Sequence, residues 1–319
     1  MKMIKYQLLS CILFLSISGS IAYPMLEINN KISNDFYEIC KIVSIERNIS
    51  LPYSNSNLYV WNDWVQNYFL REKNKDHWDI INYPKYSSHK QLQPLFEKLG
   101  LTEEYFPISK YYDYMVIFSG TPWDLIERIQ YVNYLWRSGI RATVLIHLGG
   151  LRKLHANELA FLNYNKSFPI YEHEMAKIIW NQTIDDTNLR TMLIDLIVGP
   201  RAEDCIRNPQ SRTAPPGPPD SSRRANTEDT LISFFGTYNN GSSYLFVSNA
   251  PYGPYQAETV KKVAKELYIG TKKIEVVSSR IYRDIPTIIY LDTLARRLFT
   301  IVQTKNLYRP ILLPLYDIM

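Results

Sequence analysis

Short apolar runs alternate with amphipathic segments from about residue 109 onward. The runs are typical of strands buried on both faces, and the apolar residues of the intervening segments recur at helical spacing. Together they predict a three-layer, Rossmann-like α/β domain with a mostly parallel sheet of five or slightly more strands. Strands are predicted over 114–120, 142–150, 191–199, 242–250 and 273–279, and helices over 121–140, 169–183, 226–238, 253–268 and 285–303.

The rest of the chain lacks this rhythm. Residues 23–108 are rich in Tyr, Trp and Asn, with a helical pattern near residues 90–100, and predict a mostly helical extension of the α/β domain. The domain itself is predicted over 109–306 and is interrupted by a proline-rich surface loop at 200–224. A short tail, 307–319, completes the chain.

Residues 1–22 have the features of a secretory signal peptide. Lys2 and Lys5 precede an apolar run, and small residues lead up to a predicted cleavage after Ala22. A membrane anchor is the alternative, but the apolar run of about 15 residues is shorter than the roughly 20 needed to span a bilayer. The mature protein is therefore predicted to be secreted or periplasmic, and to meet a membrane only if the signal is not cleaved.

Composition narrows the function classes. The chain is 46% hydrophobic and 21% charged, which is typical of a globular protein, and its net charge of +5 does not indicate a nucleic-acid partner. Cys40 and Cys205 permit one disulfide in an oxidising compartment, or they are two unrelated thiols. Glycosylation sequons, which matter only in a eukaryotic source, stand at Asn48, Asn165, Asn181 and Asn240.

The candidate binding residues follow from the predicted sheet. The carboxyl ends of parallel strands meet at one edge, where the N–H groups of the following helices favour a phosphate or carboxylate. Each crossing alone is typical of a turn or a helix cap, but the set predicts a polar cleft. Its residues are Ser119, Gly120 and Thr121, then Gly149 and Gly150, Asn226 and Thr227, and Ser248 and Asn249.

The sequence contains no recognisable catalytic set, so whether the chain is an enzyme stays open. His147 lies inside a strand and is predicted to be a core residue, while His155 and His173 lack metal-type spacing. The motifs GxSxG, GxGxxG and the P-loop do not occur. Glu172 and Glu174 stand at a helix start, where acidic residues favour the helix dipole.

The order of these segments resembles the YdcF-like family of bacterial proteins, which includes the envelope proteins SanA and ElyC. The resemblance covers roughly residues 112–279, and Arg128 stands where the family has an arginine in its first helix. The segments that occupy the places of the family's motifs are VIFSGT, VLIHLGG, YEHEM, ANTEDT and LFVSNAPYGPYQA. ANTEDT is the most specific of these matches. The last motif departs from the family, because Tyr252 stands near its His and Gln256 near its Arg.

Two functions follow. The first is an exported YdcF-like protein that binds a small nucleotide-like or phosphorylated ligand; the resemblance implies S-adenosylmethionine or a similar molecule as the ligand class. The second is a non-enzymatic envelope or host-interaction protein that has a vestigial cleft and binds a protein partner through residues 23–108. The predicted ligand-binding residues, with Glu172 or Glu228 as an acid or base, are Ser119, Gly120, Thr121, Arg128, Gly149, Gly150, Glu172, Glu174, Asn226, Thr227, Glu228, Ser248, Asn249, Tyr252 and Gln256.

Overall fold

The computed structural model describes residues 23–70, 85–150, 153–162, 171–198, 226–241, 243–270 and 272–307, with only the backbone for 195–198. The described chain divides into two compact units, one formed by residues 102–283 and the other by 23–101 together with 284–307. The predicted signal peptide, the 200–224 loop, Cys205 and the tail beyond Leu307 lie outside the described residues.

The larger unit contains a five-stranded sheet in which every neighbouring pair is parallel. The chain starts in the middle of the sheet, moves outward over two strands, and returns to the other side of the first strand. The strand order therefore reverses between β3 and β6, which is the topological switch point of a doubly wound fold. The order is β5-β4-β3-β6-β7, formed by β3 (Tyr111–Phe118), β4 (Arg141–Gly150), β5 (Leu193–Val198), β6 (Ser243–Asn249) and β7 (Lys273–Ser279).

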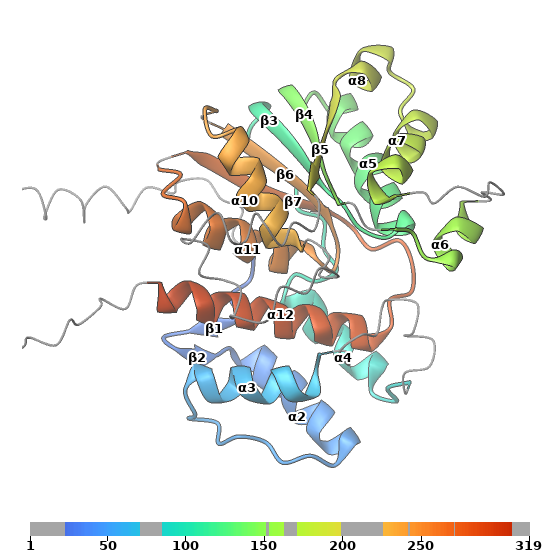
Figure 1. The fold of residues 1–319 in the computed structure, drawn as a ribbon. Coiled ribbons are helices and arrows are strands. Elements are labelled where there is room, and N and C mark those ends of the chain that lie inside the picture. The colour runs from blue at the N-terminus through green and yellow to red at the C-terminus, as the bar shows by residue number, and fades with distance from the viewer. Residues whose placement is uncertain are drawn as a thin grey trace, which may run out of the picture. The chain divides into compact units, whose positions relative to one another are not determined.

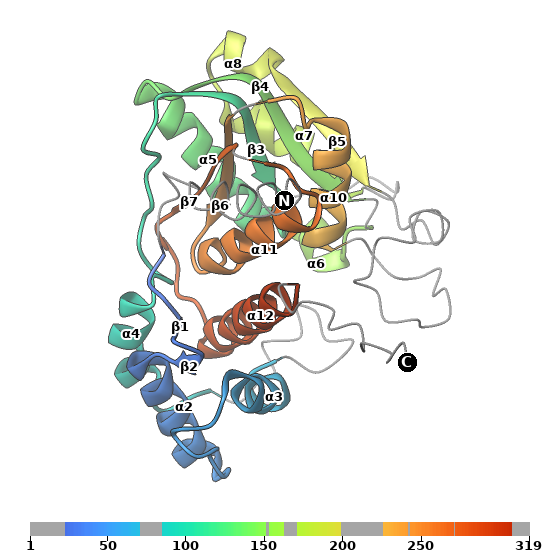
Figure 2. The same ribbon diagram turned by 90° about the vertical axis from the view of Figure 1, so that its left-hand side faces the viewer.

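Helices cover both faces of this sheet (Figure 1 and Figure 2). Helices α5 (Pro122–Arg137) and α7 (Glu172–Thr183) pack on one face. Helices α10 (Thr227–Thr237) and α11 (Gly253–Glu266) pack on the other. The short helices α6 (Ala156–Phe161) and α8 (Thr187–Thr191) were not predicted from the sequence. The three layers and the parallel sheet confirm the predicted Rossmann-like α/β fold.

Alternation along β3 separates two apolar layers. Met115 and Ile117 belong to the core that β3 shares with α5 and α7. Tyr114 contacts Phe234 of α10 edge to face, with ring centroids 6.1 Å apart, so alternate residues pack on the opposite face. Each large side chain buried in this way contributes about 1.5–3 kcal/mol to the folded state.

Two helix starts agree with the sequence. The Thr121 side chain caps α5 by accepting the N–H of Asp124. The Asn226 side chain caps α10 by accepting the N–H groups of Glu228 and Asp229, and the Asp229 carboxylate accepts the Asn226 N–H in return. Such caps typically contribute about 1 kcal/mol each.

The smaller unit is built from helices and one short hairpin. Phe96 and Tyr290 stack with ring centroids 4.4 Å apart, and the buried Arg297 donates hydrogen bonds to the carbonyls of Pro24 and Leu99. Helix α12 lies beside α3 (Figure 1). The elements are β1 (Glu27–Ile28), β2 (Lys31–Ile32), α2 (Asn34–Arg47), α3 (Leu58–Tyr68), α4 (His89–Lys98) and α12 (Thr287–Asn306).

This division differs from the predicted one, which placed the last helix in the α/β domain. Helix α12 instead joins residues 23–101 in the smaller unit. Gln66 donates to the carbonyl of Ala295, and the Tyr59 hydroxyl donates to Asn306, so contacts distant in sequence hold α12 there. Within the described residues, no helix has the length and apolar character of a membrane span.

Candidate functional site

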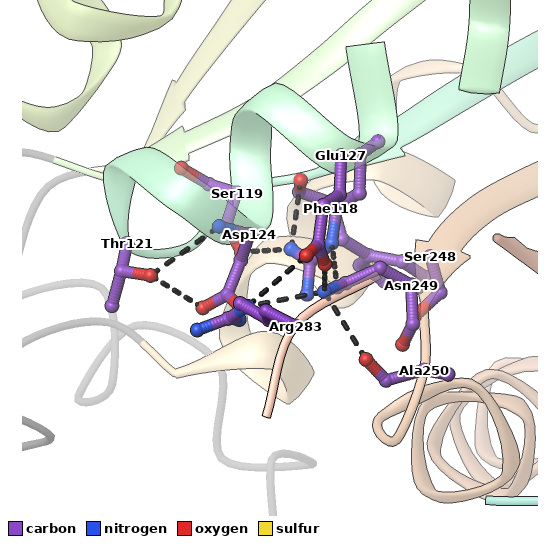
Figure 3. Close-up of polar contacts among 10 residues, drawn as sticks. Phe118, Ser119, Thr121, Asp124, Glu127, Ser248, Asn249, Ala250 and Arg283 are labelled. Atoms are coloured by element: carbon purple, nitrogen blue, oxygen red, sulfur yellow. Dashed lines mark hydrogen bonds and ion pairs between the residues drawn. The ribbon is translucent and has the colours of Figure 1, made fainter. Parts of the chain in front are cut away.

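Five polar side chains meet where β3 and β6 end (Figure 3). Asp124, Glu127 and Arg128 lie on the first turns of α5, Asn249 is the last residue of β6, and Arg283 follows β7. We call these five residues the switch-point cluster. The first four are at most 9% exposed, whereas the side chain of Arg283 is 32% exposed. The cluster therefore has a buried inner part and one partly exposed cation.

Arg128 holds the inner part to the end of β3. One of its terminal nitrogens donates to the carbonyls of Phe118 and Ser119, at 3.0 and 2.5 Å, and its Nε donates to Asn249 Oδ1 at 2.7 Å. The guanidinium also lies 5.9 Å from the centroid of the Tyr252 ring. Burial lowers the pKa of Arg128, and the nearby Asp124 carboxylate opposes that shift. Because an arginine stays charged in proteins, this side chain is a fixed internal cation.

Asn249 connects this cation to two carboxylates. Its Nδ2 donates to Glu127 Oε2 at 2.7 Å and to Asp124 Oδ1 at 3.3 Å, while its Oδ1 accepts from Arg128. The amide is fully buried. Each of its polar atoms therefore faces a charge of opposite sign, as a buried polar group requires.

Asp124 and Glu127 both face Arg283. Asp124 Oδ1 lies 2.5 Å from Arg283 Nη2, and Glu127 Oε1 lies 3.0 Å from Arg283 Nε. Burial raises the pKa of Glu127, although Arg283 and Asn249 oppose the shift. For Arg283 burial lowers the pKa, but the two carboxylates outweigh it and the net shift is upward. The like charge of Asp124 also raises the pKa of Glu127, whereas both carboxylates favour the charged form of Arg283.

The charges of the cluster decide which ligand group it accepts. Two carboxylates and two guanidinium groups sum to zero, and the Asp124 side chain already lies at the N-terminus of α5. An anion at this helix end would meet Asp124 and Glu127, so a phosphate is disfavoured there. Helix α11 begins at Gly253 without a side-chain cap and without an acidic residue in its first turn. Its N-terminus is thus the more suitable of these two for an anion.

Most of the residues predicted around strands β3 and β6 lie in or beside the cluster. The buried Ser248 hydroxyl donates to the Gln256 side chain. Ser119 Oγ is buried and has no hydrogen-bond partner among the described residues. A Cβ on Gly120 would lie 3.1 Å from Arg128 Nη1, so the glycine leaves room for the guanidinium.

The residues predicted after β4 have packing roles or end the strand. A Cβ on Gly149 would lie 3.0 Å from the Cβ of His173 and 3.3 Å from the His147 ring, so side chains fill the space in front of it. Gly150 is the last residue of β4. His147 is 1% exposed, as predicted for a core histidine.

The predicted residues on α7 and α10 mainly cap and brace helices. Glu174 accepts the backbone N–H of Tyr171. Burial lowers the pKa of Arg128, and the charge of Glu172 is one of several that oppose this shift. Thr227 is the first residue of α10 after the Asn226 cap. Glu228 accepts two hydrogen bonds from the buried Lys262 of α11, at 2.8 and 2.9 Å.

Sequence reasoning missed three of the five residues of the cluster, Asp124, Glu127 and Arg283. Asp124, Glu127 and Arg128 are spaced i, i+3 and i+4, which places their side chains on one helix face, and this pattern could have identified Glu127. Arg283 belongs to no motif. Only the three-dimensional fold brings it to the start of α5.

No family model, no curated protein and no solved structure matches this chain. The resemblance to YdcF-like proteins therefore stays a prediction based on the order of the motifs. Among the described residues, no group of three or more His, Cys, Asp or Glu side chains is placed to hold a metal ion. Cys40 is a buried free thiol, and burial raises its pKa well above the ordinary value.

Proposed function

We propose that this chain is an exported YdcF-like protein that binds a small nucleotide-like ligand at the switch point of its sheet. The observation that supports this most strongly is the position of the cluster. Doubly wound sheets bind ligands outside the carboxyl ends of their strands, where the strand order reverses. Arg128 on α5, which follows β3, and Asn249 at the end of β6 meet at that point, although they are 121 positions apart in the sequence.

The chemistry of this edge suits the two ends of such a ligand. Asp124 and Glu127 offer carboxylate oxygens, which accept hydrogen bonds from sugar hydroxyls or from amino groups. The N-terminus of α11 offers backbone N–H groups beside β6, and such groups favour a phosphate. A ligand that carries both kinds of group would lie across the end of β6.

Export is proposed on the features of residues 1–22 alone, and no catalytic step is assigned. If the site does carry out proton transfer, Glu127 is a better acid than the predicted Glu172 or Glu228. Burial raises its pKa, as is typical of carboxylic acids that hold a proton for catalysis.

Two observations favour the second function, a non-enzymatic exported protein. The charged groups of the cluster already satisfy one another, and Tyr252 and Gln256 replace the family's His and Arg. A vestigial site would have these properties, and it would bind no small ligand.

A calorimetric melting screen against nucleotides, S-adenosylmethionine and sugar phosphates separates the two functions. A ligand at about 100 times its dissociation constant adds about 2.7 kcal/mol, which raises Tm by about 5–10 °C. We expect Asp124→Asn, which keeps the side-chain shape, to weaken a hit at least tenfold. The matched control is Asp229→Asn, because Asp229 is the third residue of α10 as Asp124 is the third of α5. A hit that Asp124→Asn leaves unchanged places the ligand elsewhere, and a screen without hits favours the vestigial site.

A further inference from the structure

We propose that Arg283 is an exchangeable occupant of the switch-point cluster and that the Asp124 and Glu127 carboxylates beneath it bind a cationic group of the ligand, a guanidinium or an ammonium. The inference rests on the proposed function only in assigning this place to a ligand. It adds the charge of the group that lies there.

The two carboxylates are held in position without Arg283. Thr121 Oγ1 donates to Asp124 Oδ2 at 2.6 Å, and Asn249 Nδ2 donates to Glu127 Oε2 at 2.7 Å. Asp124 Oδ1 and Glu127 Oε1 are the oxygens that converge on the guanidinium. These side chains would therefore keep their orientation when Arg283 leaves, which is the preorganisation that a binding site requires.

Arg283 differs from the other arginine of the cluster in the ways that matter for exchange. Arg128 is 2% exposed and is bonded to backbone carbonyls of the sheet, whereas the Arg283 side chain is 32% exposed and covers carboxylates that are 5% and 10% exposed. Arg283 also lies on a segment that is neither helix nor strand. Moving its side chain aside leaves every ladder hydrogen bond of the sheet in place.

Charge decides the class of group that replaces it. Without Arg283 the cluster holds two carboxylates and the Arg128 cation, so its net charge falls from zero to −1. A monocation restores neutrality, while an anion raises the imbalance to −2. The largely buried position strengthens this preference, because charges interact more strongly away from water. In the absence of a ligand, the guanidinium of Arg283 thus occupies the place that a cationic ligand group would take.

Chemical rescue tests the proposal on the purified protein. Arg283→Ala should lower Tm, and ethylguanidinium should restore it in a saturable way. At ten times its dissociation constant, the added cation would raise Tm by about 3–6 °C. Ethylurea, which has a similar shape and no charge, should not restore Tm. Arg280→Ala, an exposed arginine of the same segment, is the matched control and should show no rescue.

Rescue that disappears when Asp124→Asn and Glu127→Gln are added supports the proposal. Equal effects of ethylguanidinium and ethylurea overturn it. Should Arg283→Ala fail to fold, modification of the wild-type protein by phenylglyoxal replaces the test. Arg283 should then react with phenylglyoxal well before Arg128 does. If the two arginines react equally slowly, the proposal that Arg283 is exchangeable is overturned. The ligand screen is independent of these measurements, so rescue without a screening hit removes the proposed ligand and not the cation site.

Discussion

Replacing Arg128 by Met should destabilise the larger unit severely. The substitution removes the donors to the Phe118 and Ser119 carbonyls and to Asn249 Oδ1; the contacts to Phe118 and Asn249 are buried and the contact to Ser119 is partly buried. Each buried acceptor left without a donor costs about 1–3 kcal/mol, and the better burial of an apolar side chain offsets part of that sum. The net loss should be about 3–5 kcal/mol, the range for removing one partner from a buried charge cluster. For a unit of this size Tm should fall by about 6–20 °C.

Urea unfolding followed by fluorescence, together with calorimetric melting, measures the loss. Arg137→Met is the matched control on the same helix, because Arg137 pairs with Asp185 at the surface, where their side chains are 66% and 65% exposed. That pair should contribute less than about 0.5 kcal/mol. Arg128→Lys should recover only part of the loss, since one ammonium cannot reach three acceptors in the guanidinium's geometry. Losses for Arg128→Met no larger than those for Arg137→Met would refute the proposed role of Arg128.

Three further predictions concern stability and pH. Gly120→Ala should cost about 1–3 kcal/mol in urea unfolding, because its Cβ would crowd Arg128. Gly236→Ala, at the second-to-last residue of α10, where a Cβ meets no neighbour within 4 Å, should instead stabilise by about 0.5–1 kcal/mol. Burial raises the pKa of Glu127, so the folded state binds that proton more tightly than the unfolded chain, and stability from this group should fall as pH rises above about 4 toward the raised pKa. Glu127→Gln should flatten that part of the stability profile measured by unfolding at a series of pH values, and an unchanged slope would contradict the shift. Lys262→Met should lower the free energy of unfolding by about 3 kcal/mol, because Lys262 is buried against Glu228. The control is Lys261→Met on the same helix, where the lysine side chain is 41% exposed, and it should change stability by less than about 0.5 kcal/mol.

The α/β fold could be predicted from local pattern because its strands are buried on both faces and two of its helices, α5 and α10, have clear side-chain caps. The strand predicted over 273–279 matches β7 to the residue, and the caps at Thr121 and Asn226 lie where the sequence places them. The hairpin β1–β2 could not be predicted, since strands of two residues have no measurable alternation. The assignment of α12 to the smaller unit depends on tertiary contacts that its amphipathic pattern does not specify.

The candidate site was predictable only in part. The rule for parallel sheets placed Thr121 and Asn249 at one edge, and the resemblance to the YdcF-like family added Arg128. The structure brings these residues together around Asp124. The rule does not say which polar groups pair there. Arg283 reaches the cluster from beyond β7, and a lone arginine in a loop has no signal in a single sequence. The pairing of Glu228 with Lys262 likewise became visible only when α10 and α11 packed together.

Stability alone does not explain why charged groups fill the switch point. Removing ions from water costs several kcal/mol each, and well-packed apolar residues of similar volume are often as stabilising as a buried ion cluster. Apolar packing was available to this sheet, because Ile117 of β3 and Val247 of β6 lie side by side and are buried just before the strands end. Beyond Ile117 and Val247 the next residues toward the carboxyl edge include Ser119 and Ser248, and this is the edge where doubly wound sheets bind ligands. A vestigial site accounts for hydrogen bonds that are satisfied, but it does not account for carboxylates held in place from behind and covered by a partly exposed arginine. A site for a ligand with a cationic group accounts for both.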